Sequence, residues 1–252
     1  MTTSRNHRVT MTQPPVSLRE AKMSQVYGRG CQITGCSLHR KSGKKYCSKH
    51  EHGFHLKGDP MQVSIKISSL QRSTQEIQEL LEANKSNPSL HDLNLALGER
   101  WVILGKAVDK YLKQYESGMA GSKGQRKGYQ VIQSLLKNVP MDEVLLLWAS
   151  FQRFEDDTPG IFVNQRSYKH QLVKHVRRIS HFVDPALINK GTGKKIVKYV
   201  VEMGVPEVNT VYDLLNQVFG VSGYQFSKAI TKRIDSKEEL DKRVRSALVG
   251  IT

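Results

Sequence analysis

The sequence predicts a mainly α-helical protein in which a small cysteine-rich module near the N-terminus precedes an all-α helical body. All three cysteines fall within residues 31–47. From about residue 70 to the C-terminus, apolar residues recur with helical periodicity. Alternation typical of a strand is confined to QVSIKI at residues 62–67. We therefore expect three parts: a flexible basic arm at 1–26, the module at 27–60 and a helical domain at 70–252.

The first two parts differ from the rest in composition. Residues 1–26 contain Pro14 and Pro15 and show little periodicity, which is typical of a flexible segment. Residues 27–60 are rich in Gly, Cys, His and Lys and have few aliphatic side chains. About 30 residues of this kind cannot bury enough apolar surface to fold without a staple.

The helical domain divides into segments that are bounded by turn residues. A capping box of Ser73 and Glu76 indicates the first helix start, and Pro140 is typical of a first helical turn. The segment SGMAGSKGQRKG at 117–128 is expected to be a basic loop; it lacks the Walker A phosphate-loop pattern. Helices are expected at 73–84, 89–116, 129–138, 141–155, 161–183, 194–203, 207–219, 223–234 and 236–248.

A metal site is predicted by the spacing Cys31-x4-Cys36-x10-Cys47-x2-His50. Zinc prefers four tetrahedral nitrogen and sulfur ligands, and two short pairs of this kind supply them. An odd number of clustered cysteines does not suit a disulfide framework. We expect Zn²⁺ as the cofactor and a zinc-binding module at 27–60. Three other histidines stay open as alternatives for the fourth ligand: His39, His52 and His55.

The stretch CQITGCSLHRKSGKKYCSKHEHGFHLKGDP at 31–60 resembles the zinc-finger segment of phage proteins, often found at the N-terminus of phage HNH-type homing endonucleases. Glu51 and Gly53 depart from that family, which tends to have aromatic and basic residues there. The resemblance implies DNA contact or structural support by a zinc finger. It ends at residue 60, where no HNH motif follows, so nuclease activity is not implied. The matching positions are Cys31, Cys36, Gly43, Tyr46, Cys47, Lys49, His50, Gly58, Asp59 and Pro60.

The charge balance favours a polyanionic partner. The chain has 39 Lys and Arg against 23 Asp and Glu, a formal net charge of +16. Nucleic acid is the polyanion that such a surplus most commonly binds. No run of 18 apolar residues indicates a membrane span, and the polar N-terminus does not resemble a secretory signal. We expect a cytoplasmic protein, in the host cytoplasm if it is phage-encoded.

Basic residues expected to contact nucleic acid lie in the module and in the helical domain. On the helix at 161–183, an apolar stripe is expected to be buried and the opposite, basic face to be solvated. The stripe consists of Tyr168, Leu172, Val176, Ile179 and Val183. The expected contact residues are Arg40, Lys41, Lys44, Lys45 and Lys49 in the module, Lys123, Arg126 and Lys127 in the loop, His170, Lys174, Arg177 and Arg178 on the basic face, and Lys194 and Lys195 at a helix start.

The segment LLNQVFGVSGYQFSKAITKRI at 214–234 resembles a helix-turn-helix, with the turn at residues 220–222. Asn216 departs from the small Ala that is usual at its position. The resemblance implies that the second helix presents side chains to the major groove of DNA. These are Tyr224, Gln225, Lys228, Thr231 and Lys232.

The expected function is therefore non-catalytic nucleic-acid binding, with DNA favoured over RNA. One alternative is a metal-dependent nuclease without a recognisable motif. Another is a phage structural or host-interaction protein that binds another protein through aromatic anchors such as Trp101, Trp148 and Phe151. The carboxylates that a nuclease would use are Asp92, Glu99, Asp109, Glu155, Asp156 and Asp157.

Overall fold

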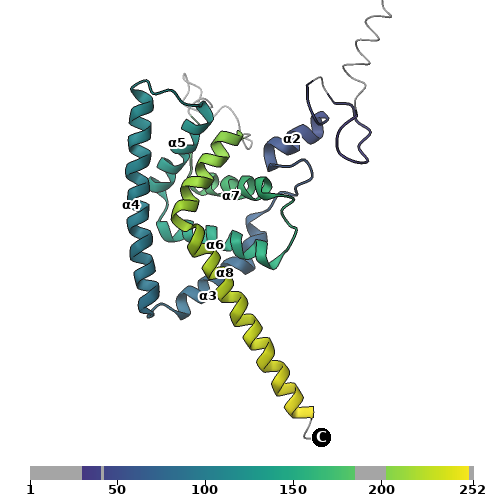
Figure 1. Ribbon diagram of the computed structural model, residues 1–252, viewed down its shortest axis with the longest axis vertical. Coiled ribbons are helices and arrows are strands. Elements are labelled where there is room, and N and C mark those ends of the chain that lie inside the picture. The colour runs from purple at the N-terminus through teal and green to yellow at the C-terminus, as the bar shows by residue number, and fades with distance from the viewer. Residues whose placement is uncertain (1–29, 41–42, 185–202, 250–252) are drawn as a thin grey trace, which may run out of the picture. The chain divides into compact units, whose positions relative to one another are not determined.

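The computed structural model describes residues 30–40, 43–184 and 203–249 (Figure 1). The chain divides into two compact units, Met1–Gly53 and Phe54–Thr252. The first unit holds the described part of the module and the beginning of α2, Ser48–Lys57. The described residues of the second unit form helices and the connections between them. The predicted fold class, mainly α with a small cysteine-rich module, is confirmed.

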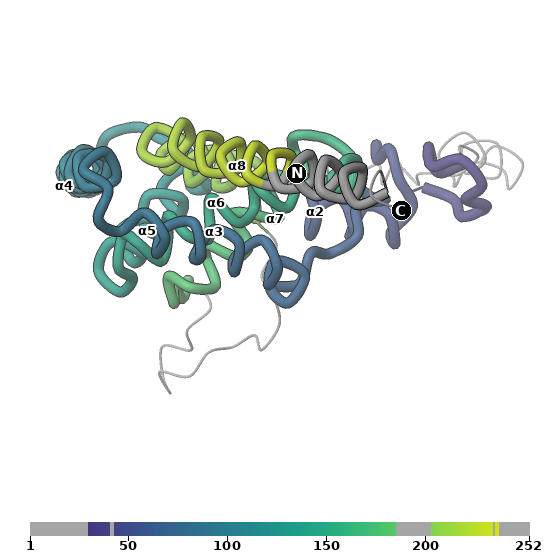
Figure 2. The backbone as a smooth tube through the Cα atoms, turned by 90° about the horizontal axis from the view of Figure 1, so that it is seen from below, coloured from purple at the N-terminus to yellow at the C-terminus, as the bar shows by residue number. Residues whose placement is uncertain are grey.

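The second unit is built from one 3₁₀ turn and six helices in its described residues. The long α8 packs against α5 and α6, and α3 packs against α6 (Figures 1 and 2). Pro88 begins α4, where the Asn87 side chain accepts a hydrogen bond from the Ser89 amide at 3.0 Å. The elements are η1 (Ile67–Leu70), α3 (Gln71–Ala83), α4 (Pro88–Glu116), α5 (Lys123–Asn138), α6 (Met141–Asp157), α7 (Gln165–Ile179) and α8 (Val205–Val249).

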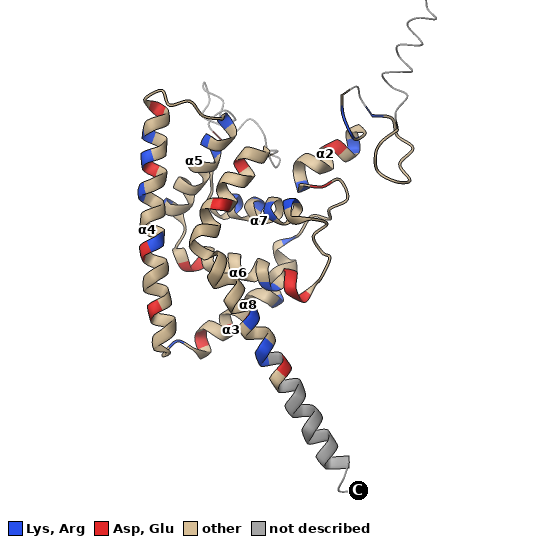
Figure 3. Ribbon diagram, viewed as in Figure 1, with Lys and Arg blue, Asp and Glu red and all other residues tan. Residues whose placement is uncertain are grey.

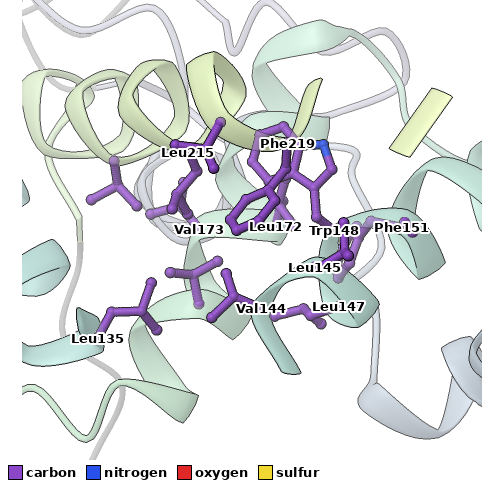
Figure 4. Packing of buried hydrophobic residues seen from close by; sticks show 14 of the residues in the cluster. Leu135, Val144, Leu145, Leu147, Trp148, Phe151, Leu172, Val173, Leu215 and Phe219 are labelled. Carbon is purple, nitrogen blue, oxygen red and sulfur yellow. The ribbon is translucent and has the colours of Figure 1, made fainter. Parts of the chain in front are cut away.

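The core of this unit lies where α6, α7 and α8 meet. Phe151, Leu172, Leu215 and Phe219 are fully buried there, and Trp148 is 2% exposed (Figure 4). Close approach of α8 to α6 requires a glycine. A Cβ atom at Gly223 would lie 2.7 Å from Cδ1 of Trp148, so a larger side chain would push the helices apart.

The helix-turn-helix expected at 214–234 is not formed. One continuous helix, α8, runs through residues 220–222. Gly220 is expected in the turn but lies inside α8, and Gly223 lets α8 pack closely on α6. The helices expected at 207–219, 223–234 and 236–248 are parts of α8. The helix expected at 194–203 falls mainly outside the described residues.

The strand expected at 62–67 is not formed, and the described residues contain only isolated bridges, Gly30 with His39 and Arg40 with Cys47. Glutamine side chains take the place of a neighbouring strand. The Gln62 amide donates to the Ile161 carbonyl at 3.0 Å and accepts from the Val163 amide at 3.0 Å. The Ile65 amide donates to the Gln171 side chain at 3.1 Å. The extended backbone is satisfied without a sheet.

Three helix boundaries differ from the prediction for local reasons. Ser73 is buried inside α3, and Glu76 binds arginines, so the capping box is wrong. The expected loop at 117–128 ends early, because the Ser122 hydroxyl accepts a hydrogen bond from the Gln125 amide at 3.0 Å and starts α5. Pro140 stands at the N-cap of α6, one residue before the first turn.

Candidate metal centre

The module brings its cysteines together through two tight backbone turns. The Cys36 amide donates to the Ile33 carbonyl at 3.1 Å, and the Cys31 amide donates to the Leu38 carbonyl at 3.1 Å. Gly35 and Gly43 have φ values of 78° and 75°, in the left-handed region that glycine adopts without strain. The loop therefore returns Cys31 and Cys36 to one place.

The second half of the site lies at the start of α2. Cys47 directly precedes the helix, and its carbonyl accepts a hydrogen bond from the Glu51 amide at 2.8 Å. His50 is three residues further on, so both side chains share one face of the first turn. Cys47 is 1% exposed and is therefore held at the centre of the module.

The side chains of the four predicted ligands lie close together. Their sulfur and nitrogen atoms all lie within 4.8 Å of one another. The Cys31 Sγ to His50 Nδ1 distance is 3.2 Å, the Cys47 Sγ to His50 Nδ1 distance is 3.5 Å, and the Cys36 and Cys47 sulfurs are 3.9 Å apart. Cys31, Cys36, Cys47 and His50 could bind a metal ion.

These separations can be compared with a tetrahedral ion. With metal–sulfur bonds of about 2.3 Å and metal–nitrogen bonds of about 2.0 Å, tetrahedral angles place neighbouring ligand atoms roughly 3.5–3.8 Å apart. The measured distances fall close to that range. The arrangement suits a closed four-ligand site with no place for a substrate.

The environment of the Cys31 thiol also suits a cation. Burial acts to raise the pKa of the Cys31 thiol, but hydrogen bonds from the backbone amides of Cys47 and Ile33 and contacts with His50 and Cys36 lower this pKa to about 6. A backbone hydrogen bond at Leu38 lowers the pKa of Cys36, while burial and the neighbouring thiols Cys47 and Cys31 act against it, and the net shift is upward. A thiolate is the form that binds metal.

The three alternative histidines are not part of this cluster. His39 and His52 are exposed, and His55 is partly buried. The geometry selects His50 as the histidine ligand. Within the described residues, no other group of histidines, cysteines and carboxylates gathers closely enough to hold a metal ion.

Basic side chains surround the metal ligands in the sequence and are exposed in the module. Lys44, Lys45 and Lys49 are exposed, and Arg40 is partly buried. Lys44 forms an ion pair with Glu51 at 3.1 Å. Lys41 lies outside the described residues. The unit Met1–Gly53 contains ten Lys and Arg but only Glu20 and Glu51 as acids, a net charge of +8 that is half of the whole chain's.

The predicted basic face of α7 is largely wrong. Tyr168, Leu172 and Val176 are buried as expected, but His170 is also buried, at 4% exposure. Arg177 forms a buried ion pair with Glu207 at 2.7 Å.

The cause of this burial is a neighbour that helical periodicity does not reveal. A Cβ atom at Gly58 would lie 3.0 Å from Cβ of His170, and Arg166 stacks 3.9 Å from the centre of the Phe54 ring. The segment after residue 54 therefore packs on α7 and covers it. Burial lowers the pKa of His170, and the charges of Arg166 and Lys174 lower it further, which favours the neutral imidazole. Of the four predicted contact residues on this face, Lys174 is partly buried and only Arg178 is exposed.

The basic residues of the other helices have mixed positions. Lys123 is exposed, the Arg126 guanidinium lies 4.9 Å from the centre of the Tyr115 ring, and Lys127 pairs with Asp184 at 2.6 Å. Lys194 and Lys195 lie outside the described residues. The Lys and Arg positions, blue on the ribbon of Figure 3, are accordingly spread over several helices of this unit and accompanied by Asp and Glu positions in red.

Most of the α8 side chains that were expected to contact DNA are exposed, although no helix-turn-helix is formed. Tyr224, Gln225, Lys228 and Lys232 are exposed, and Thr231 is partly buried. The Lys228 ammonium lies 3.7 Å from an Asp156 oxygen and 5.4 Å from the centre of the Tyr224 ring. These groups lie on one continuous helix, so they cannot enter a major groove as the second helix of a helix-turn-helix.

The carboxylates of α6 are engaged by neighbouring side chains. Asp156 accepts a hydrogen bond from the Ser227 hydroxyl at 2.6 Å, and Asp157 lies 3.5 Å from Arg153. The ion pair between Arg153 and Glu76 at 2.7 Å could not be predicted from helical periodicity, because the two residues come from different helices.

Comparisons of the chain with protein families, curated proteins and solved structures find no match. Among the described helices, none combines the length and the apolar character that crossing a membrane requires.

Proposed function

We propose that this chain is a non-catalytic nucleic-acid-binding protein whose N-terminal module is held by zinc. The observation that carries the proposal is the four-ligand cluster with Lys44, Lys45 and Lys49 exposed around it. A metal there would fix the backbone that presents these cations, so that the module would offer a positive surface of defined shape.

Zinc is the ion that best suits the ligands. Three thiolates and one imidazole are soft to intermediate donors, and zinc accepts a closed tetrahedral set of them without redox chemistry. Calcium and magnesium require oxygen ligands and would not be held here. The function of the ion is structural, because all four positions are taken by the protein.

Nucleic acid is the partner favoured by the charge. Half of the net charge lies in the unit Met1–Gly53, which is about a fifth of the chain. Each phosphate neutralised by a lysine releases counterions, so binding should weaken steeply with salt. The resemblance of residues 31–60 to phage zinc-finger segments favours DNA over RNA.

The test uses the full, zinc-loaded chain and supercoiled plasmid with Mg²⁺ at low and high salt. Half of each sample is run natively and half after protein removal. Retardation that salt abolishes, with intact supercoiled DNA after stripping, supports the proposal. Nicked or linear DNA that requires Mg²⁺ would replace it with a nuclease, and no retardation at low salt would overturn it.

A matched pair of variants locates the binding. Replacing Lys44, Lys45 and Lys49 by Gln should reduce the slope of log affinity against log salt by about 2–3. The control replaces three exposed lysines of the helical unit, Lys66, Lys85 and Lys137, by Gln. Equal losses in the two triple variants would show that the charge acts without the module.

A further inference from the structure

Helix α4 leaves one side uncovered along its length. The opposite side packs into the unit against α5 and α8 through Leu97, Leu104 and Val108. In two perpendicular views, α4 lies at the edge of the helical unit (Figures 1 and 2). The uncovered side therefore faces away from every described helix of this unit.

That outward side is apolar at its centre. Leu95, Val102 and Ile103 are 57%, 56% and 64% exposed, which is unusual for three large apolar side chains within about two helical turns. They surround Gly98, whose missing side chain leaves a shallow depression in this surface of α4. An exposed apolar stripe of this kind is typical of a surface that another helix covers.

The charged residues on the same side of α4 change sign along the helix. At about 100° per residue, Asp92, Glu99, Lys106 and Lys110 fall within roughly 20° of one line along α4. Asp92 precedes the apolar centre, Glu99 lies within it, and the two lysines follow it. Asp92 and Lys106 are exposed, and within the described residues neither has an ion-pair partner. The outward side is thus complementary to a copy of itself turned end for end.

We propose that α4 forms an antiparallel, twofold-symmetric contact with α4 of a second copy of this chain. With the axis at Glu99, Leu95 faces Ile103 of the partner subunit, and Asp92 faces Lys106 of the partner subunit. An isologous interface makes each of these contacts twice. It also brings Glu99 close to Glu99 of the partner subunit, a repulsion that the two ion pairs and the apolar contact offset. The inference does not depend on the proposed function.

One helix face gives an interface at the small end of the usual size range, so the dimer forms reversibly at micromolar concentrations. The test is light scattering on the full chain after nuclease treatment, at concentrations from about 1 to 100 µM. The mass should rise toward twice 28.6 kDa as concentration increases. A constant monomer mass would overturn the proposal.

The apolar pairing is tested by Leu95→Asp and Ile103→Asp, each of which should weaken association at least about tenfold. Both side chains are more than half exposed, so the fold is retained, and an unchanged tryptophan fluorescence transition checks this. Val221→Asp is the matched control, since Val221 is 64% exposed on α8. A dimer that resists the α4 changes, or that Val221→Asp disrupts equally, would overturn this face as the contact.

Charge reversal tests the orientation. Asp92→Lys and Lys106→Asp should each weaken the dimer, and the double variant should restore it, because the exchanged charges again face each other. In a parallel pair each residue faces its own copy and neither single change creates a new repulsion. Single variants without effect would overturn the antiparallel arrangement.

Discussion

The two units of this chain differ in what holds them. In the described part of the first unit, residues 30–40 and 43–53, Cys47 is the only buried residue. In the second unit, Phe151, Leu215 and Phe219 are fully buried among six packed helices. One unit has a ligand cluster in place of a core, and the other has a core and, in its described residues, no ligand cluster.

Because of this difference, the two units should lose their structure under different conditions. Burial of apolar surface stabilises the helical unit without any ion. The module has too little apolar surface for that, so its free energy of folding should come from metal binding. The sequence supplies separate probes, because both tryptophans, Trp101 and Trp148, lie in the helical unit. Cobalt(II) absorption, in turn, reports the thiolate site.

The largest expected effect is that of Cys47→Ser. Loss of the buried central thiolate should abolish stoichiometric zinc binding and unfold the module, because structural zinc contributes on the order of 10 kcal/mol to such a fold. The tryptophan-detected urea midpoint of the helical unit should not change. Zinc content and the amide NMR signals of residues 30–53 measure the first effect. His39→Ser is the control, and loss of zinc there would contradict the ligand assignment.

The converse change is Phe151→Ala in α6. This ring is fully buried and lies 5.4–6.3 Å from the rings of Phe162, Tyr168 and His175. The cavity should lower the free energy of unfolding of the helical unit by about 3–5 kcal/mol. Cobalt affinity of the module should stay unchanged. If it fell in parallel with stability, the two units would not be independent and the comparison would fail.

The sequence predicts the metal ligands well because their arrangement is local. Cys31 and His50 are separated by 19 residues, and tight turns with left-handed glycines join the ligand pairs. The helix predicted at 89–116 is likewise close to the observed α4, since an uninterrupted apolar stripe determines it. In both cases the information lies within the segment itself.

The errors come from contacts between distant segments. The turn expected at 220–222 is helical instead, and Gly223 beside it approaches Trp148, which lies 75 positions earlier. His170 reads as solvated, but the segment at Gly58 covers it. Arg177 reads as a phosphate contact, but Glu207 neutralises it. Periodicity describes one helix at a time and cannot show which neighbour covers its polar face.

A smaller effect is expected from Glu76→Gln, which breaks an ion pair inside the helical unit. Glu76 binds Arg153 at 2.7 Å, and the Arg153 side chain is only 5% exposed. Removing the carboxylate leaves the guanidinium with Asp157 and Thr231 and should cost about 2 kcal/mol. Urea unfolding followed by tryptophan fluorescence measures it.

The pH dependence of the Glu76→Gln variant tests whether the charge of Glu76 causes this loss of stability. Burial acts to raise the pKa of Glu76, but Arg153 and Arg72 lower it more, so the folded pKa lies below the ordinary value. The carboxylate therefore stabilises the fold fully above the unfolded pKa, and this contribution is lost as the pH falls through the folded pKa. The gap between the original chain and Glu76→Gln should close on acidification. A gap that stayed constant would show that packing, not charge, is responsible.

The smallest expected effect comes from the corresponding change in the module, Glu51→Gln. The pair of Lys44 and Glu51 has a similar distance, 3.1 Å, but the Lys44 side chain is 52% exposed. Solvent screens such a pair, so its loss should change the cobalt affinity by less than about 0.5 kcal/mol. Lys44→Gln and the double variant complete a cycle that isolates the pair from other contacts of Glu51. A coupling above about 2 kcal/mol would contradict the proposed difference between the units, because an ion pair and not the ligand cluster would then stabilise the module. A coupling near zero would support this difference. Of two ion pairs with similar distances, only the less exposed pair of Glu76 and Arg153 would then contribute to stability.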